Sequence, residues 1–179
     1  LFPYTTLFRS TPEQFWAGMD TQDDRYRYNY FKRKFAYETE EITPSHQEEI
    51  REFMEKEWCG EKTCEECHCG CLLRVIDNLV PVFDKIRING ILVRVEGKMA
   101  GLCIVSCRNG LGVYQYKNAV NRIKGINEYL LRESFERYLQ SADTINYTED
   151  MGVENLRYYK EHMAPAHTLL SKLTLTERG

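Results

Sequence analysis

The sequence has no long hydrophobic run, no visible secretory signal and no strong excess of one charge. None of its apolar stretches approaches the roughly 20 residues that a membrane-spanning helix needs. The 179 residues carry 24 Lys and Arg against 27 Asp and Glu, a formal net charge of -3, which is too close to neutral to indicate a nucleic-acid partner by itself. We therefore expect one domain with enough chain to build a core.

The cysteines are many for this length but do not suit a disulfide framework. There are 7 of them, an odd number, and most lie in one short cluster, which is typical of a reducing compartment such as the cytoplasm. A Cys-x-x-Cys pair with flanking thiols has the ligand types for tetrahedral zinc, and the predicted ligands are Cys59, Cys64, Cys67 and Cys71. The alternative is a loop of free, reduced thiols.

The first ten residues, LFPYTTLFRS, are identical to one translation frame of a widely used sequencing adapter. We interpret residues 1–10 as artefactual, so we expect natural sequence from about Thr11 and a missing upstream part. Residues 11–36 are then a linker or helix that leads from a missing N-terminal module of the same chain into a domain at 37–179. Within this linker, Arg25 to Phe35 interleaves basic and aromatic residues. This pattern indicates either RNA contact or an amphipathic helix with packed rings and solvated charges.

The order of the predicted elements indicates an α+β fold. A helix beginning at Ile126 is the clearest element, because its apolar residues recur at helical spacing. Tight-turn signals separate three strands of a meander, and Pro81 should break a helix near Val80. The predicted order is β, α, α, β, β, β, α, β, α, β over residues 37–42, 43–58, 71–86, 91–95, 99–106, 113–117, 126–139, 144–147, 153–163 and 167–175.

A short loop, Arg122-Ile-Lys-Gly125, precedes the helix at Ile126. Two cations and the backbone N–H groups at a helix start are suited to bind phosphate. The spacing Arg-x-x-Gly-x-Asn resembles the Gln/Arg-x-x-Gly-x-Gly/Ala loop with which GCN5-related N-acetyltransferases hold the pyrophosphate of coenzyme A. Asn127 departs from the final small residue of that loop. The alternative is a plain turn from a loop into a helix.

The end of the chain carries a more specific resemblance. Asn146-Tyr147, Asp150, Gly152 and the run from Leu156 to Pro165 (LRYYKEHMAP) resemble the signature of the phosphatidylglycerol lysyltransferase C-terminal domain family. That family pairs Asn-x-x-x-Asp-x-Gly with Leu-Arg-x-x-Lys and a downstream proline. The resemblance implies an acetyltransferase-like, mixed and mostly antiparallel sheet flanked by helices, as the second of two tandem modules. Asn155 departs from the glycine that is usual before Leu-Arg.

The resemblance also implies an activity. Membrane-bound members transfer an aminoacyl group, commonly lysyl, from tRNA to phosphatidylglycerol, whereas soluble relatives share the fold without an established substrate. It therefore implies aminoacyl-tRNA and an anionic lipid headgroup as partners, the latter at the membrane surface. Two alternatives stay open. One is an N-acyltransferase that uses acyl-coenzyme A, and the other is a non-catalytic module that binds tRNA or a protein and has a structural metal site.

The predicted site rests on the two resemblances. Asp150 is the candidate base or orienting carboxylate, and the donor phosphates or the headgroup would contact Arg122, Lys124, Gly125, Arg157 and Lys160. Each has a structural alternative. Asp150 is equally suited to cap the last helix, and the cations of that helix are suited to hold it to the sheet through carboxylate pairs.

Overall fold

The three strands predicted as a meander form the centre of the sheet. The computed structural model describes residues 5–59, 70–149, 154–163 and 168–171. The central strands are antiparallel and comprise β3 (Asn89–Val95), β4 (Lys98–Arg108) and β5 (Leu111–Ala119). In each connecting turn two residues have a positive φ. They are Glu96 and Gly97 in the first turn and Asn109 and Gly110 in the second. Two-residue hairpin turns of this kind match the twist of the strands that they join, so the predicted meander is confirmed.

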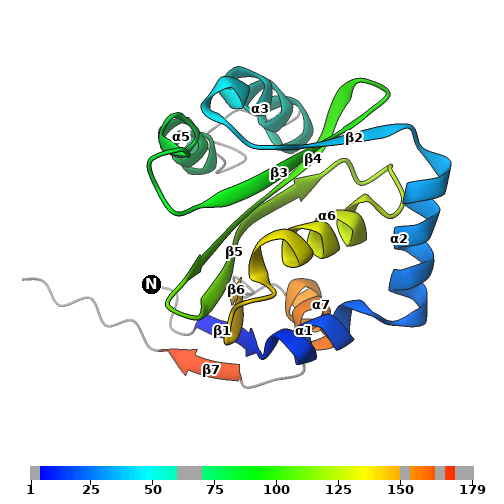
Figure 1. Cartoon of the computed structure of the whole chain (residues 1–179), viewed down its shortest axis with the longest axis vertical. Coiled ribbons are helices and arrows are strands. Elements are labelled where there is room, and N and C mark those ends of the chain that lie inside the picture. The colour runs from blue at the N-terminus through cyan, green and yellow to red at the C-terminus, as the bar shows by residue number, and fades with distance from the viewer. Residues whose placement is uncertain (1–4, 60–69, 150–153, 164–167, 172–179) are drawn as a thin grey trace, which may run out of the picture.

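Over the residues that the structure describes, the sheet has seven strands in the order β2-β3-β4-β5-β6-β1-β7 (Figure 1). The outer strands are β2 (Tyr37–Glu41), β6 (Thr144–Glu149), β1 (Thr5–Ser10) and β7 (Thr168–Ser171). Among the described strands, β5 and β6 form the one parallel pair. The prediction of a mixed, mostly antiparallel sheet is therefore confirmed. The adapter-like residues supply β1, which pairs with β6 on one side and β7 on the other.

Helices pack on both faces of the sheet, and each face has its own apolar core. One face carries α1 (Pro12–Met19), α2 (Gln22–Lys34) and α6 (Ile126–Ser134), which continues as a π-helical turn, Phe135–Leu139. The other carries α3 (Gln47–Met54), its π-helical extension Glu55–Cys59, and α5 (Gly70–Leu79). Helix α7 (Glu154–Met163) packs beside α1. Helix α5 ends where Pro81 imposes a 3-10 turn, Val80–Val82, as predicted.

The two N-terminal helices are built into the same core as the rest of the sheet. Phe15 and Met19 of α1 and Phe31 of α2 are buried against α6 and the central strands. Each helix begins at a threonine whose hydroxyl accepts a hydrogen bond from the first turn, Thr11 for α1 and Thr21 for α2. The basic and aromatic segment thus forms an amphipathic helix with one fully buried ring, and contact with RNA stays a prediction.

A buried arginine connects the corner between α1 and α2 to α6. Arg132 donates to the carbonyl oxygen of Met19 at 2.6 Å and to Oδ1 of Asp20 at 2.7 Å. Its guanidinium also lies 5.1 Å from the ring of Trp16 and 5.0 Å from that of Tyr28. Paired hydrogen bonds and aromatic faces offset the cost of burying this charge.

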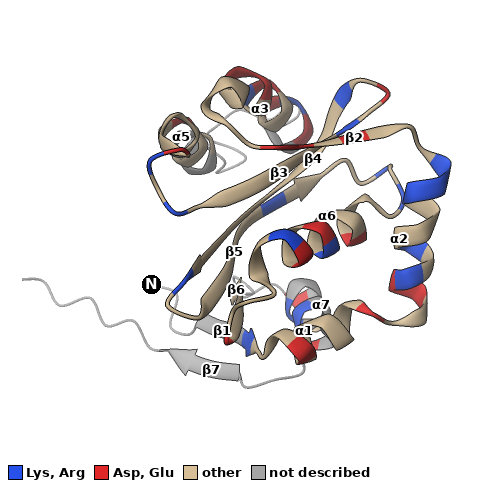
Figure 2. Ribbon diagram, in the orientation of Figure 1, with Lys and Arg blue, Asp and Glu red and all other residues tan. Residues whose placement is uncertain are grey.

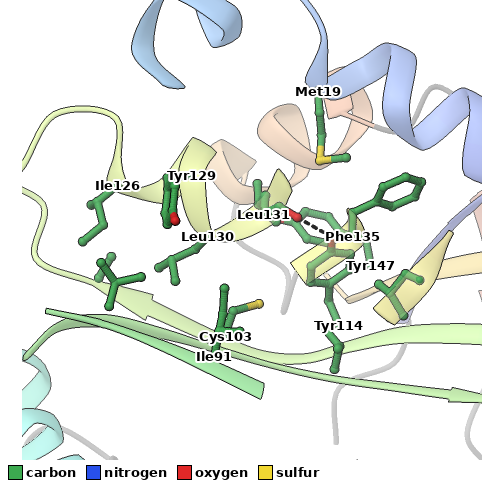
Figure 3. Close-up of a cluster of buried hydrophobic side chains, with 14 of the residues drawn as sticks. Met19, Ile91, Cys103, Tyr114, Ile126, Tyr129, Leu130, Leu131, Phe135 and Tyr147 are labelled. Atoms are coloured by element: carbon green, nitrogen blue, oxygen red, sulfur yellow. Dashed lines mark hydrogen bonds between the residues drawn. The ribbon is translucent and has the colours of Figure 1, made fainter. Parts of the chain in front are cut away.

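Three aromatic rings lie at the place where β5 and β6 separate, and we call them the aromatic cluster. The parallel pairing ends at Val113 on β5. Beyond it, the rings of Tyr114 and Tyr147 lie 5.3 Å apart at 87°, and the ring of Phe15 packs 5.2 Å and 5.4 Å from them. The Tyr114 hydroxyl donates to the carbonyl oxygen of Leu131 at 2.9 Å (Figure 3). The cluster therefore begins directly after the last residue of β5 that pairs with β6.

The first prediction concerns the cluster. We expect Phe15→Ala to lower the free energy of unfolding by about 3–5 kcal/mol, because it removes a fully buried ring and leaves a cavity. Urea denaturation followed by circular dichroism measures this loss. Tyr158→Ala is the matched control, since the Tyr158 ring is 74% exposed and its loss should change stability by less than about 0.5 kcal/mol. Equal midpoints for the two variants would show that α1 is not part of the cooperative core.

Candidate functional site

The loop predicted to bind phosphate lies between β5 and α6. Gly125 caps α6 in the left-handed conformation, with a φ of 88°, and it is buried. A Cβ atom at this position would lie 2.1 Å from the carbonyl oxygen of Arg27 and 3.0 Å from Cβ of Phe31. The backbone of α2 therefore lies directly against the glycine. This contact gives Gly125 a packing role, because no other residue fits there.

The two cations of the loop contact different parts of the molecule. Arg122 has a side chain that is 72% exposed and pairs with Glu57, next to α3, at 3.3 Å. Lys124 instead lies over the rings of two α2 residues, 4.7 Å from Tyr26 and 5.3 Å from Tyr30. Figure 2 shows how α2 and the α3 region flank the loop from separate sides. The structure thus does not bring these two cations together, and their role in phosphate binding stays a prediction.

Helix α2 also contacts the first turn of α6. The Arg27 guanidinium pairs with the Glu128 carboxylate at 3.8 Å. Together with the packing on Gly125 and the contacts to Lys124, this pair places α2 against the start of α6. Helix α2 thus contacts Lys124, Gly125 and Glu128 in turn.

The signature residues of β6 and α7 form one hydrogen-bonded unit. Lys160 is buried, and its Nζ donates to the Tyr147 carbonyl oxygen at 2.6 Å and to Oγ1 of Thr148 at 2.9 Å. The same Nζ lies 5.0 Å from the Tyr147 ring. Asn146 completes the unit, since its Oδ1 accepts the N–H of Thr148 at 2.9 Å. The structure therefore brings Asn146 and Lys160 together around the end of β6.

Thr148 has an uncommon backbone conformation within this unit. Its φ is 60°, in the left-handed region that a β-branched residue seldom adopts. Its hydroxyl donates to the carbonyl oxygen of Tyr147 at 2.7 Å while accepting from Lys160. Strained positions of this kind persist where the surroundings over-determine them, and they gather at functional sites. Among the signature residues, the unit around Lys160 is therefore the best candidate for a functional site.

The structure describes only some of the other predicted site residues. Arg157 lies on α7 with an exposed side chain. Asp150 lies outside the described residues, so its role as a base or a cap stays a prediction. Of the predicted zinc ligands, Cys64 and Cys67 lie outside them too, and the side chains of Cys59 and Cys71 are likewise not described. Among the side chains that are described, no group of three or more His, Cys, Asp or Glu could hold a metal ion.

Sequence reasoning missed Lys117. This residue lies on β5 beyond the last pair with β6, opposite Cys103 of β4. It is half-buried, and its Nζ donates to Oδ1 of Asn127 on the first turn of α6 at 2.7 Å. Burial lowers the pKa of the Lys117 ammonium because it disfavours the charged form. Asn127 departs from the small-residue pattern of the loop. It is thus the hydrogen-bond partner of a lysine on β5.

One measurable pocket lies away from these residues. It has a volume of about 220 Å³, and its lining includes Glu41, Asp84 and Tyr138 together with the apolar Phe83 and Ile42. The Tyr138 hydroxyl donates to Glu41 at 3.1 Å. The pocket opens beside the ends of β2 and α6, and none of the predicted site residues lines it. We assign it no part in the site.

Comparison with known proteins gives one family and several similar structures. Residues 14–171 match the family model described as phosphatidylglycerol lysyltransferase, C-terminal. A conserved protein of unknown function from Bacteroides thetaiotaomicron is similar with a TM-score of 0.79 and 24% identity, over 94% of this chain and 58% of that one. L-PGS from Bacillus licheniformis is similar with a TM-score of 0.58 and 18% identity, over 83% of this chain and 46% of that one. This chain thus spans about half the length of each.

The fold extends to acetyltransferases. Ribosomal-protein-alanine N-acetyltransferase from Brucella melitensis has a TM-score of 0.54 and 15% identity, over 79% of this chain and 100% of that one. The predicted acetyltransferase-like fold is therefore confirmed. No curated protein matches the sequence significantly. In the parts of the chain that the structure describes, no helix has the length and apolar character to cross a membrane.

The second prediction tests the role of Gly125. Gly125→Ala should lower the free energy of unfolding by about 2–5 kcal/mol, because a left-handed backbone costs a non-glycine residue roughly 1–2 kcal/mol and the overlap with α2 adds about 1–3 kcal/mol. Gly97→Ala is the matched control. It has a φ of 73° but nothing within 4 Å of its Cβ, so only the first cost should remain. An equal loss of unfolding free energy in the two variants, measured by urea denaturation, would show that α2 does not pack tightly against the loop.

Proposed function

This chain belongs to the phosphatidylglycerol lysyltransferase C-terminal family, and on that basis we propose that it transfers an aminoacyl group from tRNA to a hydroxyl or amine acceptor such as a lipid headgroup. The observation that supports the proposal most directly is the hydrogen-bonded unit at the end of β6. The signature residues Asn146 and Lys160 lie on two different elements, β6 and α7, and meet at Thr148. A signature that builds one strained, polar unit is more consistent with a working site than with packing alone.

The reaction needs no covalent intermediate. The acceptor oxygen or nitrogen attacks the carbonyl carbon of the aminoacyl ester, the bond to the ribose oxygen breaks, and one proton moves from the acceptor to that leaving oxygen. The protein must orient the ester, stabilise the negative charge on the carbonyl oxygen and neutralise phosphates of the donor. Lys160 contributes by fixing the end of β6. Arg157, exposed on the same helix, is the proposed contact for a phosphate of the donor or of the headgroup.

Acyl-coenzyme A is the second candidate donor, because the fold is shared with N-acetyltransferases. Its pyrophosphate would have to bind at the loop before α6. The packing of α2 on Gly125 and the pairing of Arg27 with Glu128 oppose that approach. These contacts favour the aminoacyl ester of tRNA, whose phosphates need not lie at the α6 N-terminus.

The third prediction tests the donor. We expect the full chain to transfer labelled lysine or alanine from charged tRNA to phosphatidylglycerol vesicles, measured as label that is extracted into organic solvent. Label in the aqueous phase, bound to an added amine, would indicate a soluble acceptor. Acetyl-coenzyme A is offered in parallel, with thiol release as the readout. Thiol release without aminoacyl transfer would contradict the proposal and favour the second donor.

Arg157→Ala should lower the transfer rate about ten- to a hundredfold, because a hydrogen bond to a charged group contributes about 1.5–3 kcal/mol. Arg87→Ala is the matched control, since Arg87 is exposed before β3 and far along the chain from the signature. Both variants should unfold at the wild-type urea concentration. An unchanged transfer rate in Arg157→Ala would remove this residue from the site.

A further inference from the structure

The pocket beside the end of β2 is a cavity that the proposed transfer does not use. Its walls come from the end of β2 with the turn Pro44–His46 that follows, the residues after the 3-10 turn Val80–Val82, the start of β3, and the π-helical turn of α6. In the order of the sheet, β4 and β5 lie between this edge and β6, which carries the signature unit. The pocket is therefore separate from the residues of the proposed function.

The apolar wall of the pocket is fixed by packing. Ile42 and Phe83 are each 5% exposed and belong to the apolar core on the α3 face of the sheet. Gly90 lies against both, since a Cβ there would be 2.8 Å from Cδ1 of Ile42 and 3.2 Å from Cζ of Phe83. The Ile42 N–H donates to the Gly90 carbonyl oxygen at 2.9 Å. At about 220 Å³ the pocket suits a ligand smaller than the drug-sized ones, whose sites have roughly 300–1,000 Å³.

The charged groups of the pocket are all negative. Glu41 and Asp84 line it, and none of the described residues that line it is Lys, Arg or His. Within the described part of the chain, neither carboxylate pairs with a cation, whereas the neighbouring Glu40 pairs with Arg94. The Tyr138 hydroxyl donates to Oε1 of Glu41 at 3.1 Å. A carboxylate has about four acceptor sites, so one such bond leaves Glu41 able to accept from a ligand as well.

We propose that this pocket binds a small organic cation, namely a primary ammonium group carried on a short aliphatic chain. The two carboxylates supply the charge and the acceptors for its three N–H groups. Ile42 and Phe83 supply apolar surface for the chain, and the aromatic rings in the lining, those of Phe83 and Tyr138, also attract a cation. A quaternary ammonium lacks the N–H donors, and an anion is repelled by both carboxylates. The proposal does not depend on aminoacyl transfer.

The first experiment titrates n-butylammonium into the ¹⁵N-labelled full chain and follows the amide chemical shifts. We expect saturable shifts at residues 41–44 and 83–90, with a Kd on the order of 1 mM because so few atoms contribute. Butan-1-ol, a neutral probe of similar size, should bind about tenfold more weakly, since it lacks the charge. Equal binding of the two probes, or shifts that do not saturate, would show that these carboxylates are only a solvated surface and would overturn the proposal.

Two variants remove the charges one at a time. Glu41→Gln and Asp84→Asn should each raise the Kd for n-butylammonium about two- to fivefold, the effect of one charge at a solvent-exposed position. Glutamine keeps an acceptor for the Tyr138 hydroxyl, so the first variant changes the charge alone. Glu38→Gln is the matched control, because Glu38 is exposed on β2 and does not line the pocket. If both pocket variants bind as tightly as this control, the site is wrongly assigned.

A tethered cation gives an independent readout. Asn89 is exposed at the start of β3 and lines the pocket. Asn89→Lys places an ammonium beside the two carboxylates, so added n-butylammonium should no longer give saturable shifts, while Asn89→Gln should bind it as the wild type does. Unchanged binding by Asn89→Lys would place the ligand elsewhere and overturn the proposal. Tetramethylammonium binding as tightly as n-butylammonium would overturn the choice of a primary ammonium. None of these outcomes depends on whether the chain transfers an aminoacyl group.

Discussion

The separation of β5 from β6 is the constraint on which the rest of the structure depends. Two parallel strands would continue to pair if their side chains allowed it, but the rings of Tyr114 and Tyr147 meet at right angles directly after the last pair. Phe15 of α1 packs on both of them. Three aromatic rings bury a large apolar area and prefer such edge-to-face contacts. The unpaired part of β5, which carries Lys117, therefore begins where these rings pack.

The same arrangement explains why α2 lies where it does. With α1 fixed by Phe15, the corner that follows it is tied to α6 by Arg132, so α2 runs on across the loop that precedes α6. Gly125 permits the close approach, and Lys124 joins it through two tyrosine rings. The loop that resembles a pyrophosphate site thus serves as a contact between two helices. The fold of an acetyltransferase is kept, and phosphate binding at this loop stays a prediction.

The sequence was sufficient for the order of elements from β2 onward, the meander and the break at Pro81, because turn residues and apolar periodicity are local signals. It was not sufficient for β1, which residues 5–10 supply. It was also sufficient to group Asn146 with Lys160, since their family motif spans the two elements that meet. It could not show that Gly125 packs on Arg27, nor that Arg122 and Lys124 diverge, because those contacts join residues far apart in the chain. Lys117 was missed for a related reason: a lysine in an alternating strand looks like a solvated residue until the helix above it is placed.

The contact between Arg132 and Asp20 also bears on how the protein tolerates acid. Its hydrogen bond to Asp20 lowers the pKa of that carboxyl, so the pair stabilises the fold at every pH above the ordinary range of an aspartate and fades only as the pH falls through the depressed value. The guanidinium itself does not titrate in this range. The joint between the N-terminal helices and α6 should therefore persist at mildly acidic pH.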